Sequence, residues 1–280
     1  MDENTDTIVS YRSISYVIIL TLAIQFATLF LTSRFIIHYE VLPSFEPAGG
    51  GIAGSIINSL ILVSTSILVT LMMIILIRNG KEYILKIILA SVMCLGTLFT
   101  TFTITALAMT GILYSIPIAI ITSISITSIA VISLVRPSAG RLPIIASTTL
   151  AIYYGTSLAI FMKPPTVLIL PLAFGLYDIY AVFRGPLRVL INETSEKVQF
   201  YPMIVRLGEV HIGLGDLVFY SMLPAVGLLL LNIRIAILLV GVVQVGLLST
   251  LYFLKQFKFF PGLPIPIFLG TAILTLALYL

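Results

Sequence analysis

Apolar runs of about 18–25 residues fill most of this chain, and their length restricts what it can fold into. A helix rises about 1.5 Å per residue, so about 20 residues cross the ~30 Å of hydrocarbon in a bilayer. The composition agrees, because 59% of the residues are hydrophobic and 9% are charged. An ordinary soluble domain has more polar residues to cover its surface. We therefore predict an all-α polytopic membrane protein with nine transmembrane helices, at residues 14–33, 52–77, 84–105, 114–135, 143–162, 165–183, 213–231, 235–254 and 262–280.

The basic residues indicate how such a bundle is oriented, since Lys and Arg concentrate on the cytoplasmic side of membrane proteins. Nine spans put the two termini on opposite sides. With the N-terminus inside, the outside holds three of the fifteen basic residues, Arg34, Lys163 and Arg234. This bias predicts a cytoplasmic N-terminus and an outside C-terminus. The other twelve fall at cytoplasmic ends: Arg12, Arg78, Lys81, Lys86, Arg136, Arg141, Arg184, Arg188, Lys197, Arg206, Lys255 and Lys258.

Several classes of site and partner are disfavoured. The one cysteine, Cys94, allows neither an internal disulfide nor a cysteine-based metal cluster. His38 has no cluster of carboxylates nearby in the sequence, so we expect no metal site. The net charge of +4 arises at the ends of the spans, where it reports orientation, so we expect no nucleic-acid partner. The lipid bilayer is the expected surrounding.

Two of the eleven acidic residues, Asp178 and Asp216, lie inside long apolar runs. A carboxylate at the centre of a membrane helix costs roughly 2.5–3.5 kcal/mol, so each is a functional hypothesis. Asp178 precedes Arg184 by six residues and Asp216 follows Arg206 by ten, which places both about 10 Å deep from the same face. Two close carboxyls in a low dielectric share one proton. Aspartic proteases use such a pair, one carboxyl as base and one as acid.

The residues around each aspartate resemble presenilin. Tyr177-Asp178, followed by Gly185-Pro186-Leu187-Arg188, resembles the sixth presenilin helix and the loop after it. Gly213-Leu214-Gly215-Asp216 resembles the motif of the seventh helix, and Pro261-Gly262-Leu263-Pro264 resembles the Pro-Ala-Leu-Pro motif that opens the last. The three motifs occur in the family's order, on the sixth, seventh and ninth predicted spans. The chain is similar to the presenilin and signal peptide peptidase family.

This resemblance implies an intramembrane aspartyl endopeptidase of the Gly-x-Gly-Asp type that cuts transmembrane segments of membrane proteins or signal peptides. Asp178 and Asp216 would be its catalytic residues, with water as nucleophile and without cofactor. Residues 1–162 would form a scaffold and residues 163–280 would carry the catalytic motifs, within one integrated membrane domain. The loop of about 29 residues between the sixth and seventh spans is short, as in an archaeal member, which implies a multi-pass protein of the cell membrane.

The other motif residues are expected to line the site or position the substrate. Missing side chains at the two glycines before Asp216 allow a helix or an extended peptide to come close. The prolines of the last motif prevent a regular helix start and leave backbone groups unpaired. Gly262 stands where the family usually has alanine, which suits close approach of the backbone. The expected residues are Tyr177, Gly213, Leu214, Gly215, Pro261, Gly262, Leu263 and Pro264.

Proteolysis within a membrane requires the substrate helix to unwind, and the unwound strand needs hydrogen-bond partners. Residues 198–201 and 203–205 have strand-like composition, so we expect that substrate could add to a strand edge there. A loop that packs on the helix ends is the alternative.

A different class of protein uses the same kind of acid pair. Proton-coupled transporters and ion channels carry paired intramembrane carboxylates, although no internal repeat typical of a transporter is visible here. Within the enzymes, signal peptide peptidases have similar motifs but the opposite orientation, which the charge bias disfavours. Whether the chain forms a homo-oligomer is left open.

Overall fold

The computed structural model describes residues 10–135, 141–185, 203–256 and 260–279. In these residues the chain forms nine α-helices, and each coincides with one of the expected apolar runs to within three residues at either end. Seven are long and apolar enough to cross a membrane, whereas α8 and α10 have 17 and 16 residues. The helical class is confirmed, and the count of nine spans stays a prediction. The helices are α1 (Tyr11–Ser33), α2 (Gly51–Arg78), α3 (Glu82–Ala108), α4 (Ser115–Val135), α5 (Leu142–Phe161), α6 (Thr166–Phe183), α8 (Leu214–Leu230), α9 (Ile233–Gln256) and α10 (Pro264–Tyr279).

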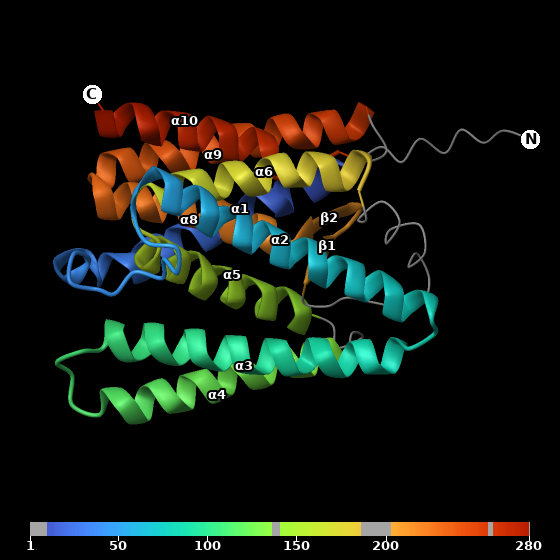
Figure 1. Ribbon diagram of the computed structural model, residues 1–280, viewed down its shortest axis with the longest axis horizontal. Helices are drawn as coiled ribbons and strands as arrows, with labels where there is room; N and C mark the ends of the chain where they lie inside the picture. Colours follow the sequence, from blue (N-terminus) through green and yellow to red (C-terminus); the bar gives the residue numbers. More distant parts are fainter. Residues whose placement is uncertain (1–9, 136–140, 186–202, 257–259, 280) are drawn as a thin grey trace, which may run out of the picture.

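The helices form a bundle with α8 at its centre (Figure 1). The residues of α8 from Leu217 to Leu228 are buried, because α1, α5, α9 and α10 all pack against it. Close packing on α5 depends on Gly155, where a Cβ would lie 2.1 Å from Ser221 Oγ. The Ser221 hydroxyl lies within hydrogen-bonding distance of Ala151 O, at 3.2 Å. At Gly155 the two helices approach each other without a large side chain between them.

The outer helices surround this centre. α6 lies between α2 and α10, and the α3–α4 hairpin packs on α5 at one side of the bundle (Figure 1). Large apolar side chains stay exposed on these helices, such as Leu68, Leu95 and Ile121, as expected of helices that face lipid. α1 begins and α2 and α6 end near the β1–β2 hairpin, while α10 ends at the opposite end of the bundle (Figure 1). The orientation in the membrane stays a prediction.

A short antiparallel hairpin leads directly into α8. It consists of β1 (Ile204–Leu207) and β2 (Val210–Gly213), with Ile204 opposite Gly213 and Arg206 opposite His211. The expected strand at 203–205 corresponds to the start of β1, whereas residues 198–201 lie outside the described part of the chain. Gly213 ends β2 and is also the N-cap of α8, so the hairpin continues into the helix without a loop between them.

The turn of the hairpin is fastened to the start of α1. The Glu209 carboxylate accepts hydrogen bonds from the Ser13 hydroxyl at 2.7 Å and from the Ser10 backbone N–H at 3.2 Å. A Cβ at Gly208, whose φ is +64°, would lie 2.2 Å from Ser13 Oγ. These hydrogen bonds, Ser13 first, lower the pKa of Glu209 from 4.5 to about 2. The contact therefore strengthens in the ionised state.

We expect this fastening to weaken as the pH falls. The pKa of Glu209 is depressed in the folded protein, so its stabilisation is complete above pH 4.5 and is lost as the pH falls toward 2. Hydrogen exchange of the amides in residues 203–213 should be slower in the wild type than in Glu209→Gln at neutral pH. That difference should shrink across the same pH window. A difference that stays constant with pH would show that the charge of Glu209 does not hold the hairpin.

Candidate active site

Two aspartates from separate helices meet at the chain segment that enters α10. Asp178 lies near the end of α6, and Asp216 lies in the first turn of α8. Asp178 accepts the backbone N–H of Leu263 at 3.0 Å and also that of Gly262. Asp216 accepts the backbone N–H of Gly213 and interacts electrostatically with Asp178. The structure thus brings the two carboxyls, 38 residues apart in sequence, to one place.

Gly262 is the point where the backbone comes closest to Asp216. A Cβ at this position would lie 2.5 Å from Asp216 Oδ2 and 3.1 Å from its Cγ. The Tyr220 hydroxyl donates a hydrogen bond of 2.8 Å to Gly262 O. The glycine that departs from the resembled motif therefore occupies a position with no room for a side chain unless Asp216 moves.

Tyr220 is a site residue that the sequence analysis did not single out. It is buried, at 2% exposure, its hydroxyl donates to Gly262 O, and it interacts electrostatically with the two aspartates. A signal for it exists in the sequence, because Tyr220 follows Asp216 by four residues and so lies on the same face of α8. The spacing alone does not identify Tyr220 as a site residue, because a tyrosine in an apolar helix can also lie there for packing.

The remaining expected residues lie around this centre in different roles. Tyr177 is half-buried and points about 100° away from Asp178 around α6. Leu214 donates its N–H to Met203 O at 2.7 Å and packs partly into the core. A Cβ at Gly215 would meet nothing within 4 Å, so the chain itself leaves that position open. Buried in the segment that enters α10 are Pro261, Leu263 and Pro264.

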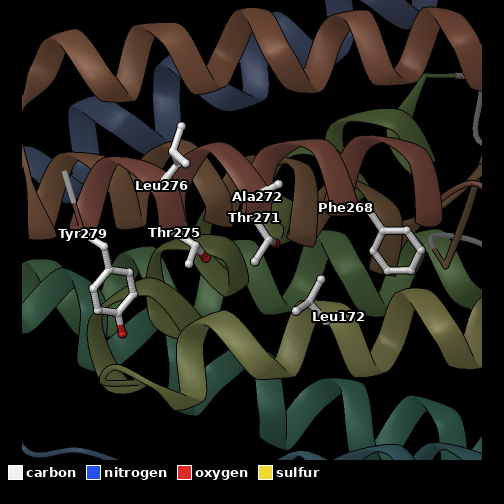
Figure 2. Close-up of a pocket in the computed structure, with 7 residues that line it drawn as sticks. All are labelled: Leu172, Phe268, Thr271, Ala272, Thr275, Leu276 and Tyr279. Carbon is white, nitrogen blue, oxygen red and sulfur yellow. The ribbon is translucent and has the colours of Figure 1, made fainter.

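A groove of about 450 Å³ runs along α6 and α10 beside this centre (Figure 2). Leu172 of α6 faces a row of α10 side chains from Phe268 to Tyr279, and the lining is mostly apolar. The Phe268 ring closes against α6 at Gly175, where a Cβ would lie 2.9 Å from its Cε1. Neither aspartate lines the groove, and its lining residue on α6, Leu172, precedes Asp178 by six residues, or almost two helical turns.

No group of three His, Cys, Asp or Glu side chains that could hold a metal ion occurs among the residues described here. The acidic chemistry of the site consequently lies in the aspartate pair, with backbone N–H groups and the Tyr220 hydroxyl as its polar surroundings.

Comparisons with known proteins agree with the resemblance of the motifs. No family model matches the chain. It is 35% identical over 114 residues to presenilin-B of Dictyostelium discoideum, a stretch that covers 38% of this chain and 24% of that protein. The chain thus matches about a quarter of the length of this curated relative.

Solved structures extend the likeness to almost the whole chain. Two structures of a presenilin-family intramembrane aspartate protease cover 94% and 92% of it, and 97% and 96% of their own chains. Their TM-scores are 0.58 and 0.57, at 18% and 19% sequence identity, which shows a shared fold. The chain therefore resembles a presenilin over part of its length, and it is an integral multi-pass membrane protein with the fold of the presenilin-family intramembrane aspartate proteases.

Proposed function

We propose that this protein is an intramembrane aspartyl endopeptidase in which Asp178 and Asp216 act together on a peptide bond. The observation that carries the proposal is the meeting of these two carboxyls at Gly262 and Leu263, inside an apolar bundle. A pair of carboxyls in such surroundings shares one proton, so one can take a proton from water while the other donates one. Peptide hydrolysis needs these two roles at once.

The backbone around the pair supports a fixed geometry. Two consecutive N–H groups, of Gly262 and Leu263, hold the Asp178 carboxyl, and the N–H of Gly213 holds that of Asp216. Each carboxyl is therefore oriented by backbone rather than by mobile side chains. General acid–base groups held in place by rigid donors avoid the cost of reorientation during the reaction.

The hairpin offers a place for an unwound substrate. A two-stranded sheet has open edges, and β2 reaches Asp216 through Gly213 with two residues between them. Gly215, which lies between Gly213 and Asp216, is exposed and leaves open space on its side of α8. A substrate strand added to the hairpin would pass close to the aspartates, which supports strand addition over a loop that only packs. The substrate class is then a transmembrane segment that can extend locally.

The function is tested with the purified protein in liposomes and a transmembrane peptide labelled at both ends. We expect cleavage that stops when a hydroxyl-bearing mimic of the tetrahedral intermediate is added, because such a mimic binds more tightly than substrate. Metal chelators serve as the control and should leave the rate unchanged. If no cleavage occurs and the aspartates instead support a flux of protons or cations, the transporter or channel hypothesis would replace the protease hypothesis.

A further inference from the structure

A proline interrupts the central helix one turn after Tyr220. Pro224 lies inside α8 and is buried. In a helix the N–H of each residue bonds the carbonyl four residues earlier, and proline has no N–H. The carbonyl oxygen of Tyr220 is therefore left without its donor from α8. A buried carbonyl without a partner is costly, on the order of 1–3 kcal/mol, so another donor is expected.

The replacement donor comes from a different helix. Gln25 of α1, with no exposed surface, donates its side-chain Nε2 to Tyr220 O at 3.0 Å. Its own carbonyl oxygen accepts from Gln244 Nε2 of α9 at 2.8 Å. Gln244 is fixed in turn by Thr21 of α1, at 3.0 Å from its nitrogen and 3.2 Å from its oxygen. Three helices thus meet in one buried polar network that ends on the backbone of Tyr220.

This network differs from the other cross-helix contacts in where it ends. The hydroxyls of Thr105 and Tyr153, for example, join α3 to α5 at 3.2 Å without touching a residue of the candidate site. Tyr220, in contrast, is held by Gln25 at its backbone and donates its hydroxyl to Gly262 O. Gly262 and Leu263 are the residues whose N–H groups hold Asp178. A displacement of the Tyr220 backbone would therefore change both the segment before α10 and the space around Asp216.

We propose that Gln25 is a positioning residue for the aspartate pair, acting through Tyr220 by supplying the hydrogen bond that Pro224 cannot make. The inference rests on the proposed function and adds a part of the molecule outside its motifs. Gln25 does not touch the reacting atoms. It fixes the depth and rotation of the first turns of α8, and Gln244 and Thr21 keep its amide in the required orientation. Because Pro224 removes one hydrogen bond within α8, the position of the Tyr220 backbone is fixed by side chains of α1 and α9 instead.

The test compares Gln25→Met with the wild type, and repeats the comparison in a Pro224→Ala background. Methionine keeps the length and volume but cannot donate, so we expect kcat for the transmembrane peptide to fall about tenfold with little change in KM. Alanine at position 224 restores a backbone N–H for Tyr220 O. In that background, Gln25→Met should lower kcat by no more than about twofold. We also expect Gln25→Met to lower the melting temperature in the wild-type background and to leave it unchanged in the Pro224→Ala background.

A matched control separates positioning from stability. Thr105→Val removes a cross-helix hydroxyl contact remote from the site and should lower the melting temperature without lowering kcat. Tyr220→Phe keeps the backbone but removes the hydroxyl, and adding Gln25→Met to it should cost less than in the wild type.

Three results would overturn the proposal. An unchanged kcat in Gln25→Met, with a lowered melting temperature, would leave Gln25 a purely structural residue. Equal losses with and without the Pro224→Ala substitution would show that Gln25 does not replace the missing amide. If the wild type shows no cleavage dependent on Asp216, the proposed function fails and the positioning role fails with it. The melting temperatures alone then decide whether the amide replacement is real.

Discussion

Replacing either Asp178 or Asp216 by asparagine should reduce cleavage of a transmembrane peptide by about 10⁴-fold, the upper range for loss of an acid–base group. The structure holds both carboxyls by backbone N–H groups, and asparagine keeps the shape while it removes the ability to take or give the proton. Because the two act as a unit, the double variant should be no slower than either single one. Single-turnover cleavage in liposomes, followed by mass spectrometry of the products, measures the rates.

Folding provides the internal control for this experiment. Each carboxyl sits in an apolar bundle, where an ionisable group is costly, so asparagine should leave the melting temperature unchanged or raise it. Glu40→Gln is the matched variant, because it removes an exposed acid outside the long apolar runs and should keep full activity. Wild-type cleavage in Asp178→Asn or Asp216→Asn would remove the basis of the protease proposal.

The helix bounds could be predicted because lipid leaves the backbone few choices. Every N–H and C=O in the hydrocarbon must be paired, so an apolar run of sufficient length becomes a helix and ends where charge or proline occurs. The boundary between the third and fourth helices had only Gly111 as a breaker, and the structure places a turn there in which Gly111 has a φ of +87° and Tyr114 of 70°. The motif residues of the last helix could also be placed near the aspartates from the sequence, because three motifs on known spans leave few arrangements.

The packing between helices could not be predicted in the same way. The buried polar residues of α1 recur every three to four residues from Thr21 to Thr32, which indicates an inward face, but they do not show which helix packs against it. Gln25 therefore gave no sign that its partner lies on α8, and Tyr220 gave no sign that it contacts Gly262. β2 is four residues long, and the turn before it is fastened to α1 by the hydrogen bond between Ser13 and Glu209, a contact distant in sequence. The neighbour that each helix face packs against is the information that a single sequence lacks.

Enlarging the side chain at position 262 should reduce cleavage in steps, from about tenfold for Gly262→Ala to more than about 10²-fold for Gly262→Val. A methyl group there would lie 2.5 Å from Asp216 Oδ2, and this oxygen can move by rotation of the carboxyl. A branched side chain would also meet Asp216 Cγ, at 3.1 Å from the Cβ, and the Tyr220 hydroxyl, at 3.5 Å. The aspartate would then be displaced as a whole. Rates in liposomes, read as kcat at saturating peptide, measure the series.

Gly215 is the matched control for this series, because a Cβ there meets nothing within 4 Å of the folded chain. Gly215→Ala should leave the melting temperature unchanged, whereas Gly262→Val should lower it as Asp216 and Tyr220 are forced apart. If an extended substrate lies against Gly215, the same methyl group should raise KM while kcat changes little, the opposite of the effect at position 262. If Gly262→Val and the wild type had equal kcat, catalysis would not require Asp216 to occupy its observed position next to Gly262.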